Sequence, residues 1–252
     1  MPQLMRSSNP ALGDKTFRGL PGYEDVSNRM TLNGTVNKTG LLLLFAFATA
    51  AFTWLQFVQT RDIASVASWM MLGGIGGFIC AMVTIFKKQW APVTAPIYAL
   101  LEGLVLGGLS AVFELRYPGI AVEAVALTFG VLFMMLFLYR SGIIRVTDKL
   151  RMGIFAATGA IALFYLLQMV LGLFHFQFTT INGSGPIGIG FSLLVVGIAA
   201  FNLLLDFDFI QRGAEYGAPK YMEWYGAFSL MVTLIWLYLE MLRLLSKVNR
   251  RN

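Results

Sequence analysis

Seven long apolar blocks dominate the sequence, and they exclude a soluble globular fold. A helix needs roughly 20 mainly apolar residues to cross a bilayer, and each block is near that length. Hydrophobic residues make up 57% of the chain and charged residues 13%, which is typical of integral membrane proteins. The blocks are continuously apolar rather than alternating, so they predict helices and not barrel strands. We therefore predict an all-α, polytopic membrane protein, a bundle of seven transmembrane helices over residues 39–248, with spans near 41–58, 63–86, 91–113, 120–139, 153–174, 187–209 and 225–245.

The two ends of the chain are polar. Residues 1–38 contain several prolines and glycines and lack the short apolar core of a secretory signal, so we predict a flexible cytoplasmic tail. Residues 249–252 form a short basic C-terminal end. Cys80 is the single cysteine, which excludes an intramolecular disulfide.

Lysine and arginine are distributed unevenly between the connections. The tail and the connections after the second, fourth and sixth blocks hold most of them, whereas the opposite connections hold only Arg61 and Arg116. The positive-inside rule then predicts a cytoplasmic N-terminus in a multi-pass membrane protein. The net charge of +6 is explained by these block ends, so we expect the lipid bilayer, and no nucleic acid, as the partner of the basic residues.

The last block conflicts with this rule. Seven crossings would place four basic residues on the outside: Arg243, Lys247, Arg250 and Arg251. Either the block is re-entrant, or it spans fully and the rule yields at a final helix that has no later segment to orient. We favour full spanning.

Gly103 and Gly107 form a GxxxG pair in the third block. Small residues at this spacing let two helix backbones approach closely in lipid. The pair is either a dimer face or ordinary packing within one subunit, and we favour the second. A monomer and a homodimer both remain open.

Two acids near the ends of the last two blocks, Asp206 and Glu240, are the strongest candidates for a functional site. A carboxylate at membrane depth costs several kcal/mol by a rough estimate, so it is retained where it faces protein, water or a cation. Arg243 follows Glu240 at i+3 and offers a local ion pair. Asn202 precedes Asp206 by one turn and can donate a hydrogen bond but not a charge. Spacing alone does not bring the two acids together, because a straight antiparallel arrangement would leave them roughly 18 Å apart along the axes.

Further acids lie within the blocks. Glu102 is near the middle of the third block without a basic residue one turn away, so it is a candidate pathway acid. Asn202 and Asp208 are further pathway candidates. Asp208 has Arg212 at i+4, which predicts an ion pair at the interface. The interior of the blocks is net acidic, which suits a route for cations or protons and not for anions.

The sequences LLDFDFI at residues 204–210 and LYLE at residues 237–240 resemble motifs of the Bax inhibitor-1 family, the transmembrane Bax inhibitor motif proteins, in their bacterial branch. The resemblance covers roughly residues 30–248. It implies a seven-helix fold in which a pH-sensitive pair of acids gates a calcium leak, closed when the pair shares a proton and open when it is broken. Asp206 and Glu240 would be that pair and transient Ca²⁺ ligands. Glu240 stands where the family usually has aspartate. Lys87 or Lys88 matches the family's basic residue after the second helix, and both lysines are possible ion-pair partners. The bacterial branch implies a multi-pass protein of the bacterial inner membrane.

The predicted function is therefore a pH-sensitive calcium-leak channel that conducts Ca²⁺ or H⁺. Two alternatives stay open: a membrane interaction protein that modulates a membrane-bound protease, as bacterial relatives are known to do, and a proton-coupled transporter. We expect no enzymatic activity and no cofactor. The lone His175 has no serine nucleophile at a suitable spacing, and no His, Cys or carboxylate cluster has zinc spacing.

Overall fold

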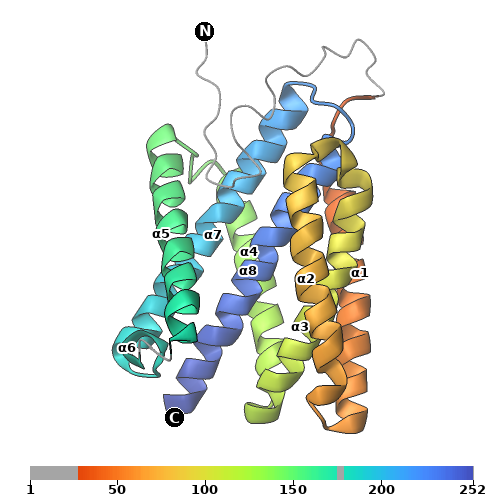
Figure 1. The fold of residues 1–252 in the computed structure, drawn as a ribbon. Coiled ribbons are helices and arrows are strands. Elements are labelled where there is room, and N and C mark those ends of the chain that lie inside the picture. Colours follow the sequence, from red (N-terminus) through yellow and green to blue (C-terminus); the bar gives the residue numbers. More distant parts are fainter. Residues whose placement is uncertain (1–27, 175–178, 252) are drawn as a thin grey trace. The chain divides into compact units, whose positions relative to one another are not determined.

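The computed structural model describes residues 28–174 and 179–251. Most of the expected tail, the last residue of the basic end and His175 lie outside this part of the chain. The described residues form eight α-helices and one short 3-10 helix: α1 (Leu32–Thr60), α2 (Ala64–Phe86), η4 (Lys88–Trp90), α3 (Ala91–Arg116), α4 (Ile120–Arg140), α5 (Asp148–Leu173), α6 (Thr179–Asn182), α7 (Pro186–Glu215) and α8 (Met222–Arg251) (Figure 1).

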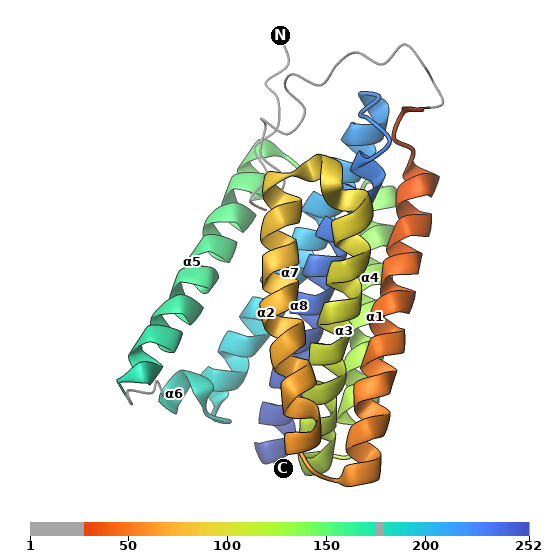
Figure 2. The ribbon, with the colours of Figure 1, turned by 45° about the vertical axis from the view of Figure 1, so that its right-hand side comes forward.

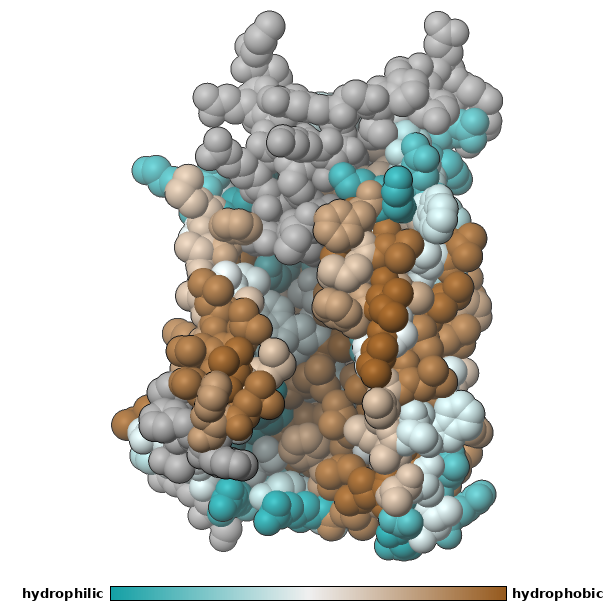
Figure 3. Space-filling model, viewed as in Figure 1, coloured by the Kyte–Doolittle hydropathy of each residue, from teal (hydrophilic) through white to brown (hydrophobic). Residues whose placement is uncertain are grey.

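Seven of the described helices are long and apolar enough to cross a membrane, which confirms the predicted all-α, seven-helix architecture. On the face shown in Figure 3, apolar side chains follow the helices and hydrophilic ones gather toward the helix ends. The last predicted span is one unbroken helix of 30 residues, α8. At 1.5 Å per residue it is about 45 Å long, which exceeds the thickness of a hydrocarbon core.

The predicted boundary between tail and first helix at residue 38 is wrong by two turns. Helix α1 begins at Leu32, because the Thr31 hydroxyl accepts a hydrogen bond from the Gly34 amide and caps the helix. These first turns are polar, so the apolar pattern of the sequence does not include them. The four-residue helix α6 and the 3-10 helix η4 were not predicted either.

The described residues divide into two compact units, and each is considered by itself. We call residues 28–121 and 208–232 the α1–α3 unit, and residues 122–207 and 233–251 the α4–α5 unit. The boundary falls within α7 and within α8, so each of these two long helices contributes one segment to each unit.

In the α1–α3 unit, helix α3 packs along both α1 and α2, which contact each other little (Figures 1 and 2). Glycines permit this approach. A Cβ atom added at Gly103 would lie 2.2 Å from the backbone oxygen of Ala46, and one at Gly107 would lie 2.1 Å from that of Ala50. The GxxxG pair is therefore used for packing α3 against α1 inside the chain, as favoured above, and its face is not open to a second copy.

In the α4–α5 unit, the first part of α7 contacts both α4 and α5. The rings of Phe164 on α5 and Phe191 on α7 lie 5.3 Å apart in an edge-on arrangement. The rings of Tyr139 on α4 and Phe207 on α7 lie 5.9 Å apart. These aromatic contacts hold the part of α7 that carries Asp206.

Candidate functional site

Glu240 lies at the centre of a charged network in the α4–α5 unit. Glu240 is only 1% exposed to solvent. Oxygen Oε1 accepts hydrogen bonds from the Arg243 guanidinium at 2.7 Å and from the Tyr165 hydroxyl at 2.9 Å. Arg243 also donates to the Tyr165 hydroxyl at 2.6 Å, and its guanidinium lies 4.9 Å from the centre of the Tyr165 ring. Tyr165 therefore bridges the two charges and fixes the geometry of the pair.

The second oxygen of Glu240, Oε2, is buried and has no hydrogen-bond donor within reach among residues 28–174 and 179–251. Buried polar atoms are nearly always hydrogen-bonded, so an exception indicates a place for a proton, a water molecule or an ion. The side chain of Arg243 is 44% exposed, so water reaches the cationic side of the pair while the carboxylate stays buried. The buried partner of the pair is thus the Glu240 carboxylate, and the exposed partner is the Arg243 guanidinium.

Asp206 lies on α7 in the same unit and is also 1% exposed. One turn earlier, the Asn202 amide donates to the Thr158 hydroxyl of α5 at 2.8 Å and to the Ile198 carbonyl at 2.9 Å. Asn202 thus links α7 to α5 at the level of Asp206. The α4–α5 unit contains both acids of the predicted pair.

The remaining predicted acids lie in the α1–α3 unit. Asp208 pairs with Arg212 at 3.0 Å, the i,i+4 ion pair that the sequence predicts. Glu102, half-buried on α3, lies against α2, since a Cβ atom at Gly77 would be 2.9 Å from its carboxylate oxygen. Tyr98, one turn earlier on α3, interacts with Glu102. Glu102 therefore has a tyrosine as its neighbour rather than a cation.

Neither lysine after α2 pairs with an acid in the described part of the chain. Lys87 is exposed and ends α2 through its backbone amide, which donates to the Val83 carbonyl at 2.8 Å. The ammonium of Lys88 lies 5.8 Å from the ring centre of Tyr225. A cation over an aromatic face is the contact that the structure shows for Lys88.

Sequence reasoning missed a third buried acid, Glu223, in the first turn of α8. It is fully buried and forms ion pairs with Lys38 and, at 2.9 Å, with Lys220. The backbone amide and the hydroxyl of Thr31 donate to the same carboxylate at 2.9 and 2.8 Å. We call these four residues the Glu223 clamp. It joins the start of α1 to the start of α8, and Lys220 at i−3 was the only signal of it in the sequence.

Lys247 was also missed as an internal contact. This lysine is 7% exposed, and its ammonium donates to the carbonyls of Ile181 and Gly188 at 2.8 and 3.0 Å and to the Ser192 hydroxyl at 2.9 Å. It ties the end of α8 to the connection between α6 and α7. The sequence places Lys247 one turn after Arg243, but it does not indicate these long-range acceptors.

No group of three or more His, Cys, Asp and Glu side chains gathers as a metal site in the part of the chain that the structure describes. One buried carboxylate oxygen of Glu240 accepts hydrogen bonds from Arg243 and Tyr165, whereas the other accepts none from the described residues.

Comparison with known proteins identifies the family of the chain. No curated protein and no solved structure matches the chain significantly. A family model described as Bax inhibitor 1 like matches residues 6–250, nearly the whole chain. The match agrees with seven apolar helices long enough to cross a membrane. The chain is a multi-pass membrane protein that belongs to the Bax inhibitor 1-like family.

Proposed function

We propose that this protein is a cation leak pathway, controlled by pH, in which Glu240 and Asp206 are the proton-binding groups and Ca²⁺ is the ion conducted. The proposal includes a cytoplasmic N-terminus, which rests on the distribution of Lys and Arg, and a bacterial inner-membrane location, which rests on the resemblance to the bacterial branch of the family. It includes no enzymatic step. Family membership supports a Bax inhibitor-like membrane protein, and the channel activity rests on the site itself.

The observation that carries the proposal is the buried carboxylate of Glu240, which has one oxygen held and one open. An ionised carboxylate in an apolar helix bundle is stabilised by its ion pair, here with Arg243. Protonation neutralises the carboxylate and removes that pair. A divalent cation at Oε2 would compete with Arg243 for the same charge. Either event releases the Arg243 guanidinium toward water, where its side chain is already half exposed.

Tyr165 connects the change in ionisation of Glu240 to the packing of two helices. Its hydroxyl donates to Glu240 and accepts from Arg243. Loss of the charge on Glu240 weakens the first of these hydrogen bonds, because a neutral carboxyl is a poorer acceptor than a carboxylate. Tyr165 lies on α5, and Glu240 and Arg243 lie on α8. A change in ionisation would therefore loosen α5 from α8 within the α4–α5 unit.

The test is calcium flux into liposomes that contain the purified full-length protein, measured at several pH values. We expect flux above that of empty liposomes, with a clear dependence on pH. Glu240→Gln should flatten this dependence, because an amide neither takes up a proton in this range nor forms an ion pair with Arg243. Asp206→Asn should also change it. Tyr165→Phe should shift the pH dependence without abolishing it.

Glu123→Gln is the matched control. Glu123 is an exposed acid in the first turn of α4, so its replacement should leave flux and pH dependence unchanged. Wild-type flux equal to that of empty liposomes would overturn the proposal and favour a membrane interaction protein. A pH dependence that persists in both Glu240→Gln and Asp206→Asn would exclude these acids as the proton-binding groups.

A further inference from the structure

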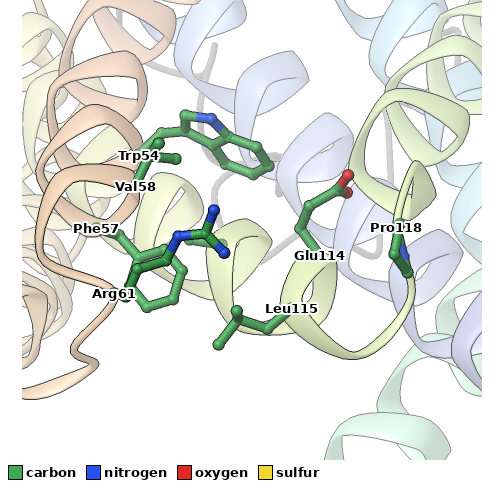
Figure 4. A pocket seen from close by; sticks show the side chains of 8 residues that line it. Trp54, Phe57, Val58, Arg61, Glu114, Leu115 and Pro118 are labelled. Carbon is green, nitrogen blue, oxygen red and sulfur yellow. The ribbon is translucent and has the colours of Figure 1, made fainter.

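A pocket of about 250 Å³ opens in the α1–α3 unit, at the ends of α1 and α3. Its walls are mostly apolar, and two charged side chains reach it, Arg61 from the end of α1 and Glu114 from the last turns of α3. Figure 4 shows Arg61 and Trp54 on one side of the pocket and Glu114 on the other. The pocket has no part in the carboxylate site of α7 and α8.

Arg61 is held in position but its charge is not neutralised by the protein. Its backbone is left-handed, with φ at 53°, and its amide donates to the Phe57 carbonyl at 2.7 Å, which ends α1. Left-handed backbone costs roughly 1 kcal/mol or more for a residue with a side chain. Within residues 28–174 and 179–251, no carboxylate forms an ion pair with Arg61. The guanidinium therefore presents its donors to whatever enters the pocket.

Glu114 is fixed in a different way. Its two carboxylate oxygens accept hydrogen bonds from the amides of Gly119 at 2.6 Å and Ala121 at 3.2 Å, which caps the start of α4. Each carboxylate oxygen has a further lone pair, and the side chain lines the pocket. The pocket thus offers a rigid anion, a cation and an aromatic ring in one small space.

The position of the pocket indicates its occupant. It lies where two membrane helices end, the depth at which lipid headgroups meet protein, and tryptophan is enriched there. Its volume, about 250 Å³, equals about eight water molecules at roughly 30 Å³ each, close to the roughly eight non-hydrogen atoms of a phosphoethanolamine group. The pocket is smaller than typical sites for drug-sized ligands.

We infer that this pocket binds the headgroup of a zwitterionic phospholipid with a primary ammonium, its phosphate at Arg61 and its ammonium at Glu114 and the Trp54 ring. Arginine binds phosphate oxygens through two parallel hydrogen bonds. A primary ammonium donates hydrogen bonds to a carboxylate and is attracted to an aromatic face. Val58, Leu115 and Pro118 supply apolar walls for the glycerol and the first carbons of the acyl chains.

The two charges select among lipids. A purely anionic headgroup would satisfy Arg61 but would place no cation beside Glu114. A choline headgroup carries a quaternary ammonium, which has no N–H to donate to Glu114. A headgroup with both a phosphate and a primary ammonium can pair with both Arg61 and Glu114. We therefore expect it to bind at least severalfold more tightly than the anionic or the choline headgroup.

The test uses purified full-length protein and phospholipids with identical acyl chains and ethanolamine, glycerol or choline headgroups. Native mass spectrometry measures lipid retained per protein, and the thermal unfolding midpoint is followed as each lipid is added. We expect the ethanolamine lipid to be retained most and to raise the midpoint most. Soluble glycerophosphoethanolamine should give little of this effect, because the apolar walls contribute to binding; an equal effect would identify a free phosphate compound as the ligand and overturn the lipid assignment.

The variants separate the two charges. Arg61→Gln should weaken binding of the ethanolamine lipid about tenfold, as expected for loss of a charge-assisted pair. Arg116→Gln, at the exposed arginine that ends α3, should not. Glu114→Gln keeps an acceptor for the α4 cap and should reduce the preference for ethanolamine over glycerol. Equal binding of the three lipids by the wild-type protein, or unchanged binding by Arg61→Gln, overturns the inference. The lipid comparison needs no variant, so the test stands even if Arg61→Gln does not fold.

Discussion

Replacing Glu223 by glutamine tests whether the Glu223 clamp stabilises the fold. The substitution keeps the shape of the side chain and an acceptor for Thr31, but it removes the charge that two ammonium groups share. Breaking a buried ion pair by removing one partner typically costs about 3–5 kcal/mol. Here the side chains of Lys38 and Lys220 are 19% and 47% exposed, so water recovers part of the loss and we expect about 2–3 kcal/mol.

This loss corresponds to a fall in the unfolding midpoint of about 5–10 °C, at about 2–4 °C per kcal/mol for a chain of this size. The assay is thermal unfolding of the purified protein in detergent, followed by tryptophan fluorescence. Trp224 is a local reporter, since the Lys38 ammonium lies 5.4 Å from its ring centre. Glu215→Gln, at an exposed acid near the end of α7, is the control and should shift the midpoint by no more than about 1 °C.

A double-mutant cycle identifies the cause. Lys38→Met should destabilise the wild-type protein but have a much smaller effect in the Glu223→Gln background, because the two residues contact each other. Gly34→Ala should reproduce much of the Glu223→Gln effect, since a Cβ atom at Gly34 would overlap the Glu223 carboxylate. The reasoning is refuted if Glu223→Gln shifts the midpoint no more than Glu215→Gln does, or if the effects of Lys38→Met and Glu223→Gln are additive.

Two other substitutions test packing and the α6–α7 connection. Gly107→Ala should lower the unfolding midpoint by several degrees, because its Cβ would lie 2.1 Å from the backbone oxygen of Ala50, and a backbone atom cannot move aside as a side chain could. Gly74→Ala is the control: its Cβ would have no atom within 4 Å, so the change should be neutral or stabilise the fold by up to about 1 kcal/mol. Equal midpoints for the two variants would contradict the packing argument. Lys247→Met should accelerate hydrogen exchange of the backbone amides at the connection between α6 and α7, because three acceptors lose their donor. Arg250→Gln, at an exposed arginine, is the control and should not change this exchange. Equal exchange in both variants would show that the Lys247 ammonium does not hold this connection.

The local ion pairs show what a sequence can predict about a site. Arg243 follows Glu240 at i+3, and Arg212 follows Asp208 at i+4, so helix geometry alone places each pair on one face. The structure contains both pairs. The family resemblance of the two motifs also holds, since the family model matches nearly the whole chain.

The long-range partners could not be predicted in the same way. Tyr165 is 75 residues from Glu240, and Lys38 is 185 residues from Glu223. Which side chains meet over such distances depends on how each helix is rotated about its axis and at what height it packs. Neither quantity is encoded in hydropathy, which in an almost uniformly apolar helix varies little from face to face.

The spans follow from the sequence because a bilayer imposes a local rule: every backbone polar group must be bonded within its own helix, over a length of roughly 20 apolar residues. The ends of helices obey a different rule, which is why the polar first turns of α1, capped by Thr31, were assigned to the tail. The GxxxG spacing in the sequence predicted a close contact, and only the tertiary structure decided that the partner is α1. The chain thus determines by itself which segments are helical and apolar. The burial of Glu240 and Glu223 among donors from distant helices is decided by packing, because a carboxylate becomes a site only through the groups that fold around it.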